Sequence, residues 1–176
     1  MFANKLRNMQ VWASEKVINL DHKTTTLNYT ECLRRIKGGT VYADPPYGFV
    51  HYSRFYHALE TLCLYDYPDL QIKGGSMVKG RYRENRHQSP FCIKSQVEGA
   101  FFDLFSGVKL ADANLALSYS NTAMITLERL LDISKRVLKS NYEIWVEDTD
   151  HHHMTMGRLN DRSREVKELM LLARKK

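Results

Sequence analysis

Cysteine is scarce in this sequence of 176 residues, and no hydrophobic run is long enough to span a membrane. The three cysteines, Cys32, Cys63 and Cys92, are odd in number and widely spaced. This spacing fits neither a disulfide framework nor a zinc site, and it is typical of reduced thiols. The sequence also lacks a secretory signal pattern, an internal repeat and a low-complexity segment. We therefore expect one domain with a cytoplasmic location and no membrane contact.

Positive charge exceeds negative charge, with 26 Lys and Arg against 20 Asp and Glu, which favours a polyanionic partner. Basic residues gather between positions 67 and 90, in a segment that also contains Gly74, Gly75 and Gly80. A flexible basic loop suits contacts to nucleic-acid phosphates, and an aromatic between two arginines suits insertion beside a displaced base. The alternative is an ordinary solvated loop. The residues that we expect to contact nucleic acid are Lys73, Lys79, Arg81, Tyr82, Arg83 and Arg86.

The most informative stretch is an apolar, β-prone run at Thr40–Ala43 that is followed by Asp44, two prolines and Tyr47. The prolines cannot continue a strand, and the first of them biases Asp44 away from helical conformation. Asp44 should therefore lie at the carboxyl end of a strand, with Tyr47 just beyond it in a stiff loop. In open α/β sheets the ligand crevice lies outside that end. The alternative is a rigid turn with a polar corner.

The motif Asp44-Pro45-Pro46-Tyr47 resembles the Asp-Pro-Pro-Tyr motif of the D12-class adenine-specific (N6) DNA methyltransferases. Segment 52–61 resembles the helix that follows the motif in that class, and segments 117–121 and 161–164 also resemble it. The similarity extends from about residue 17 to the C-terminus. It implies methyl transfer from S-adenosylmethionine to an adenine that is flipped out of DNA.

The motif also makes chemical sense, because the lone pair of an aromatic amine is delocalised and the amine is a poor nucleophile. Asp44 and the Pro45 carbonyl could accept its two N–H bonds and orient the lone pair, while stacking by Tyr47 contributes about 1–3 kcal/mol. Positioning and electrostatics would then supply most of the catalysis. The resemblance further implies that both Asp21 and Asp44 contact the cofactor. It implies a base pocket lined by Tyr52, Tyr119 and Asn121.

The order of predicted elements indicates an α/β fold, in which helices alternate with strands. Strands are expected at 17–20, 40–43, 113–119, 141–147 and 168–173, and helices at 26–36, 49–65, 91–108 and 124–138. Thr26 is a possible N-cap, and Phe55, Leu59 and Leu62 form a stripe that predicts a core contact. The resemblance implies a partial Rossmann-like S-adenosylmethionine-dependent methyltransferase sheet, with strands 3 to 7 present and the first two missing. In that family the strand order is third, second, first, fourth, fifth, seventh, sixth.

The family binds its cofactor through a Gly-rich turn after the first strand, where the backbone must approach the cofactor closely. No glycine precedes Gly38 in this sequence. We therefore expect a partial methyltransferase domain over 1–176 whose Asp44 strand has an unpaired edge. Such a chain should pair with a missing N-terminal half or form a homo-oligomer. The adjacent His151, His152 and His153 predict no metal site, because neighbouring residues on an extended chain point to alternate sides.

Two other functions remain open on the sequence. The chain could be a catalytically inactive nucleic-acid-binding fragment of the same fold. Alternatively, the same chemistry could act on RNA or on a protein amide, although the basic loop argues against protein as the acceptor.

Overall fold

The computed structural model describes residues 23–46, 48–49, 52–149 and 168–176. Its main sheet has four strands, β1 (Thr40–Ala43), β4 (Asn114–Ser120), β5 (Tyr142–Thr149) and β6 (Glu168–Lys175), in the order β1-β4-β6-β5. Strands β1 and β4 are parallel, whereas β6 is antiparallel to both β4 and β5. The expected mixed α/β fold is confirmed. This order equals the one implied for the fourth to seventh strands, but the partial Rossmann-like assignment stays a prediction, since 17–20 lies outside the described residues.

The parallel pairing of β1 and β4 fixes which residues lie at the same end of the sheet. Thr40 pairs with Asn114 at one end, and Ala43 pairs with Leu117 at the other. Two glycines with positive φ, Gly38 and Gly39, lead the chain into β1, and the Asn114 N–H donates to the Gly39 carbonyl at 2.8 Å. Only glycine adopts two such angles in succession at low cost. The chain segments that follow β1 and β4 therefore leave the sheet at its carboxyl end.

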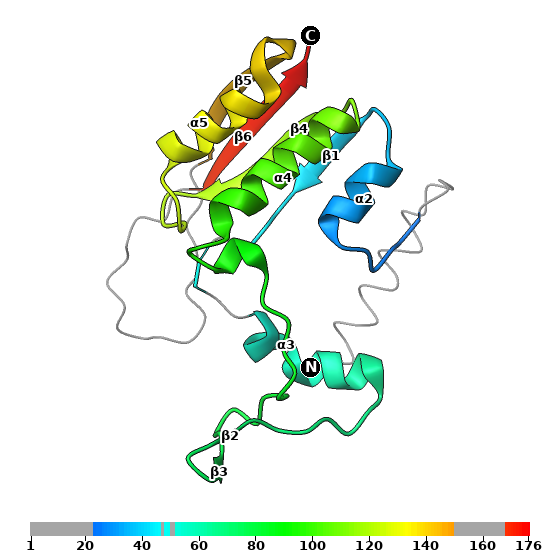
Figure 1. Ribbon diagram of the computed structural model, residues 1–176, viewed down its shortest axis with the longest axis vertical. Coiled ribbons are helices and arrows are strands. Elements are labelled where there is room, and N and C mark those ends of the chain that lie inside the picture. The colour runs from blue at the N-terminus through cyan, green and yellow to red at the C-terminus, as the bar shows by residue number, and fades with distance from the viewer. Residues whose placement is uncertain (1–22, 47, 50–51, 150–167) are drawn as a thin grey trace.

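Three helices cover one face of the sheet, namely α2 (Tyr29–Arg35), α4 (Val97–Leu110) and α5 (Leu127–Leu138) (Figure 1). The Asn28 side chain accepts a hydrogen bond from the Thr30 N–H at 3.0 Å and caps α2, so the expected Thr26 cap is wrong. The Thr126 hydroxyl accepts from the Arg129 N–H and caps α5, which begins at Leu127, three positions after the expected start at 124. In both cases the side chain able to satisfy a free N–H fixed the start of the helix.

The core lies between α4, α5 and the covered face of the sheet. Phe101 and Phe105 of α4 are almost fully buried, and they pack with Leu117 of β4 and Leu171 of β6. The stripe expected on 91–108 is therefore correct from Val97 onward. Before that point the chain forms a 3-10 turn, η1 (Pro90–Cys92), which Pro90 opens at a position where its missing N–H costs no hydrogen bond.

Helix α3 (Tyr52–Leu64) differs from the expectation, since it has no buried residue. Phe55, Leu59 and Leu62 are 70%, 56% and 67% exposed, so their predicted place in the core is wrong. Helical spacing defines an apolar face but does not supply a partner for it. Helix α3 lies beyond the end of the sheet, together with the small hairpin of β2 (Ile72–Lys73) and β3 (Ser76–Met77) (Figure 1).

Candidate active site

Asp44 follows directly after β1, at the carboxyl end of the strand, as the sequence predicted. The two prolines after it leave the sheet in an extended path, and the chain then enters α3 at Tyr52. A carboxylate and the start of an aromatic helix are thus held at one end of the sheet.

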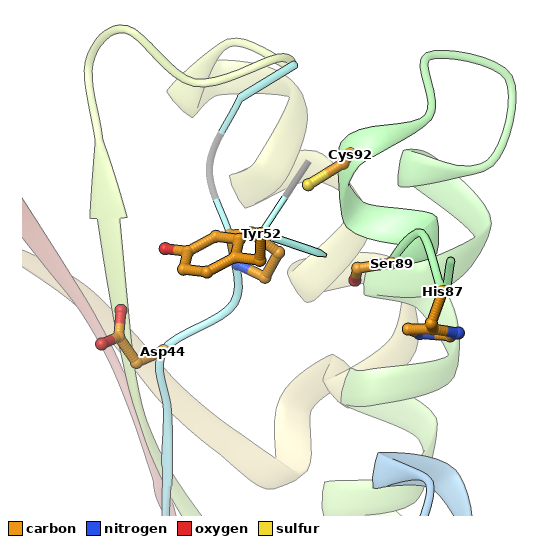
Figure 2. A pocket seen from close by; sticks show the side chains of 6 residues that line it. Asp44, Tyr52, His87, Ser89 and Cys92 are labelled. Atoms are coloured by element: carbon orange, nitrogen blue, oxygen red, sulfur yellow. The ribbon is translucent and has the colours of Figure 1, made fainter. Parts of the chain in front are cut away.

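A cavity of about 370 Å³ opens between Asp44 and the segment that follows the basic loop. Asp44, Pro46 and Tyr52 form one side of it, and His87, Ser89 and Cys92 form the other. Figure 2 shows Ser89 and Cys92 projecting toward the side on which Tyr52 and Asp44 lie. This volume is in the range of small-molecule sites and is large enough for one nucleobase.

Tyr52, one of the residues expected in the base pocket, lines this cavity. Burial raises the pKa of its phenol, and the negative charge of Asp44 raises it further. The phenol therefore stays protonated at neutral pH and can donate a hydrogen bond. Its ring also stacks on Tyr56, with the two centroids 5.8 Å apart.

The second side of the cavity was missed by sequence reasoning. His87, Ser89 and Cys92 belong to the junction between the basic loop and α4, just before and at the start of the helix expected at 91–108. No local pattern marks these residues as a pocket wall. Their role depends on how the loop returns from α3 to the sheet.

The basic loop at 67–90 is an ordered hairpin rather than a loose segment. Gly74 and Gly75 both have positive φ at the tip, as a tight two-residue turn requires. The Gln71 N–H donates to the Tyr82 carbonyl, and the Glu84 N–H donates to the Asp69 carbonyl, both at 2.7 Å. These bonds extend the pairing of β2 and β3 toward the base of the loop.

Three of the residues expected on nucleic acid make contacts that fasten this loop. Arg83 forms a two-bond ion pair with Asp66 at the end of α3, and its side chain is only 12% exposed. The Tyr82 ring lies under the guanidinium of Arg86 and against the edge of His57. Arg86 also donates to Gln71 at 3.1 Å. The sequence could not separate these residues from solvent-facing cations, because a charge run does not show which members find partners within the fold.

The other three expected contacts, Lys73, Lys79 and Arg81, are exposed on the hairpin. Arg54 of α3 adds a further exposed cation on the same side of the loop, with its guanidinium 5.9 Å from the Tyr82 ring. The hairpin thus presents positive charge to solvent.

Tyr119 and Asn121 do not line the cavity. Tyr119 is 2% exposed, packs edge-on against Phe101, and donates a 2.8 Å hydrogen bond from its hydroxyl to the Ile125 carbonyl. The expectation that it faces the base is corrected: it is a core residue, and burial raises its pKa to about 12. Asn121 is exposed after β4, at the same end of the sheet as Asp44. A motif in an extended strand alternates between faces, and its sequence alone did not show which face is covered.

Several sequence predictions lie outside the described residues. They are Tyr47, Asp21, the strand at 17–20, the three histidines at 151–153 and segment 161–164. In the part of the chain that the structure describes, no three His, Cys, Asp or Glu side chains are arranged to hold a metal ion. Within the same residues, no helix combines the length and apolar character needed to cross a membrane.

The described residues do not build a site for S-adenosylmethionine. The Gly38-Gly39 turn lies at the amino end of β1, opposite Asp44, and the Gly74-Gly75 turn lies at the hairpin tip. Neither turn therefore brings glycine backbone close to the cavity, as a cofactor contact of this kind requires.

Asp44 at the end of a parallel strand, a small cavity and a basic hairpin make up the candidate site. The profile of the D12 class N6 adenine-specific DNA methyltransferases matches residues 2–107. The chain belongs to this family.

Similar proteins are DNA modification enzymes. The chain is 34% identical to the modification methylase LlaI of Lactococcus lactis subsp. lactis, over 68% of this chain and 18% of that protein. It is 32% identical to the type II methyltransferase M.FokI of Planomicrobium okeanokoites, over 70% of this chain and 18% of that protein. It is 29% identical to the type II methyltransferase M.NlaIII of Neisseria lactamica, over 65% of this chain and 32% of that protein. The chain therefore spans less than a third of the length of these relatives. No solved structure matches it.

Proposed function

We propose that this chain provides the target-base and DNA-binding part of a site-specific DNA adenine-N6 methyltransferase. The observation that carries the proposal is the position of Asp44, at the carboxyl end of β1 and on the wall of a cavity that Tyr52 also lines. The names of the relatives favour a role in restriction and modification. A DNA substrate agrees with the expected cytoplasmic location.

In this proposal the flipped adenine enters the cavity with its amino group toward Asp44. Asp44 and the Pro45 carbonyl accept its two N–H bonds, and Pro46 holds the turn in one conformation. Tyr47 stacks on the base, and Tyr52 forms the apolar wall beside it. These contacts draw the amine toward a pyramidal shape, so that its lone pair becomes available for reaction. Preorganised acceptors of this kind lower the barrier by positioning and electrostatics.

DNA would be held by the hairpin, which serves as the target-recognition loop of a single partial domain. Lys73, Lys79 and Arg81 are exposed there and can contact phosphates. A two-stranded ribbon is also of a size that the major groove admits. Arg83 and Tyr82 support the loop from within.

S-adenosylmethionine is the methyl donor that the family implies, and its site would come from another polypeptide segment. That segment would carry the Gly-rich turn and the first two strands of the sheet. It would pair with the side of β1 that has no strand partner among the described residues; a second copy of the chain is the alternative occupant. The chain would then be one half of a split enzyme or a fragment of a longer one.

The test is transfer of a labelled methyl group from S-adenosylmethionine to DNA, with and without an upstream polypeptide that carries the Gly-rich turn. Asp44→Ala should abolish transfer and leave DNA affinity within about two-fold, because the carboxylate contacts only the amine. Asp103→Ala, an exposed acid on α4, is the matched control and should retain activity. Transfer that survives Asp44→Ala would contradict the proposal.

The competing function is a catalytically inactive nucleic-acid-binding fragment of the same fold. The absence of a cofactor site among the described residues favours it. It predicts DNA binding without transfer in every arm of the same experiment. An RNA substrate offered in parallel distinguishes the third alternative, an RNA amino-methyltransferase.

A further inference from the structure

Ser89 stands where a helix-capping serine would stand, yet its side chain makes no capping hydrogen bond. A serine at the start of a helix ordinarily accepts a bond from a free backbone N–H. Here the Cys92 N–H is satisfied instead by the Ser89 carbonyl, at 2.9 Å. The Ser89 side chain lines the cavity, on the side opposite Asp44 (Figure 2).

The two sides of the cavity are chemically complementary. Asp44 supplies an acceptor on one side, and the Ser89 hydroxyl supplies a donor on the other. Pro46 and the Tyr52 ring lie with Asp44 on the first side, and Cys92 lies with Ser89 on the second, and these apolar groups suit the face of a flat ring. A heteroaromatic ring with an amino group next to an unprotonated ring nitrogen matches this pattern.

The position of Ser89 is fixed rather than adaptable. Pro90 follows it at the first position of η1 and restricts the backbone there. The ion pair of Arg83 with Asp66 and the contact of Arg86 with Tyr82 hold the preceding loop against α3. A hydroxyl held in this way can discriminate between rings, because a mismatched ring leaves it without a partner.

We propose that Ser89 is a specificity-determining residue, whose hydroxyl donates a hydrogen bond to one of the ring nitrogens that flank the amino group of the target adenine. The inference rests on the proposed function, since it takes the cavity as the site of the flipped base. It adds a residue on the basic-loop side of the site, and it explains why a serine is placed at η1 without capping it.

The experiment titrates 2′-deoxyadenosine 5′-monophosphate into the ¹⁵N-labelled chain and follows the amide signals of residues 87–92 by NMR. The 1-deaza and 7-deaza analogues, which each lack one flanking nitrogen, are titrated in the same way. The variants are Ser89→Ala, Asp44→Ala and the control Ser95→Ala, an exposed serine that does not line the cavity.

We expect the wild-type chain to bind the natural nucleotide about ten-fold more tightly than one of the two analogues. Ser89→Ala should bind the natural nucleotide as weakly as the wild type binds that analogue, so that the preference disappears. Ser95→Ala should keep the wild-type preference. A capping serine would lower the Tm by about 2–4 °C when replaced, and we expect no such shift for Ser89→Ala.

A Ser89→Ala chain that keeps the wild-type preference, while Asp44→Ala binds more weakly, overturns the role of Ser89 and leaves the base site in place. Nucleotide binding that neither variant alters overturns both this inference and the assignment of the cavity to the base.

Discussion

Arg83 and Asp66 are joined by two parallel hydrogen bonds, from Nη1 to Oδ1 at 2.7 Å and from Nη2 to Oδ2 at 2.5 Å. Arg83 also donates to the Thr61 hydroxyl at 3.2 Å, so one guanidinium ties the end of the basic loop to the end of α3. The hydrogen bond from Arg83 holds the pKa of the Asp66 carboxyl below its usual value of 3.8. Of the cations that the sequence grouped together, Arg83 thus serves the shape of the loop, while Lys79 faces solvent.

This difference predicts opposite results for two variants of the loop. Asp66→Asn should speed hydrogen exchange at the Gln71 and Glu84 amides, because the loop loses its anchor to α3. The global free energy of unfolding should stay close to that of the wild type, since the Asp66 carboxylate is partly exposed and its interactions are screened by solvent. Lys79→Ala should leave exchange unchanged and lower the slope of log K against log salt for DNA binding by about one.

The pH dependence of amide hydrogen exchange in the basic loop provides a control for the ion pair of Arg83 and Asp66. Because the folded-state pKa of Asp66 is lowered, its contribution is complete above 3.8 and is lost as the pH falls through the folded-state value. The wild-type loop should therefore stay protected down to about pH 4 and loosen below it, whereas Asp66→Asn should show no such step. A loop that is equally protected in both proteins at neutral pH would show that the ion pair anchors nothing.

Tyr119→Phe tests the assignment of Tyr119 to the core. The variant should lose about 1–2 kcal/mol of stability at pH 7, because the Ile125 carbonyl loses its partner. Between pH 8 and pH 11 the free energy of unfolding of the wild-type protein should fall by about 1.4 kcal/mol more than that of the variant. The reason is that the pKa of Tyr119 is about 12 in the folded state and has its usual value of 10 in the unfolded state. Urea unfolding of both proteins between pH 8 and pH 11 measures the difference.

DNA affinity is the control for this substitution. A core role predicts that Tyr119→Phe binds DNA and 2′-deoxyadenosine 5′-monophosphate as the wild type does. Weaker nucleotide binding with unchanged stability would contradict the core assignment and favour a place for Tyr119 in the base pocket.

The contact between α2 and α4 can be tested with two glycines of the same helix. A Cβ on Gly107 would lie 2.6 Å from Leu33 Cδ1 and 3.0 Å from Leu33 Cβ, whereas a Cβ on Gly99 would meet nothing within 4 Å. Gly107→Ala should therefore lower the free energy of unfolding by about 1–3 kcal/mol, because the new methyl group pushes α2 away from α4. Gly99→Ala should raise the free energy of unfolding by about 0.5–1 kcal/mol, because alanine favours the helix. Thermal unfolding of the pair measures both effects, and equal shifts would contradict this packing.

Much of the fold was predictable because its signals are local. The run at Thr40–Ala43 became β1 with the expected bounds, since the prolines beyond Asp44 cannot extend a strand. Apolar periodicity identified α4 and α5, because both of them bury one continuous stripe. The same periodicity failed for α3, whose apolar stripe finds no cover among the described residues. Spacing along a helix carries no information about what lies opposite.

The sequence by itself determined the acid at the end of a strand, the stiff turn after it and the excess of positive charge in the loop. These depend on backbone sterics and on composition, which each residue carries with it. Only the tertiary structure decided that Tyr119 turns into the core, that Arg83 and Tyr82 support the loop, and that Ser89 faces Asp44 across a cavity. Those outcomes depend on which surfaces meet when α4 packs on the sheet and when α3 and the loop fold beyond its end, and such long-range contacts leave no pattern in neighbouring residues.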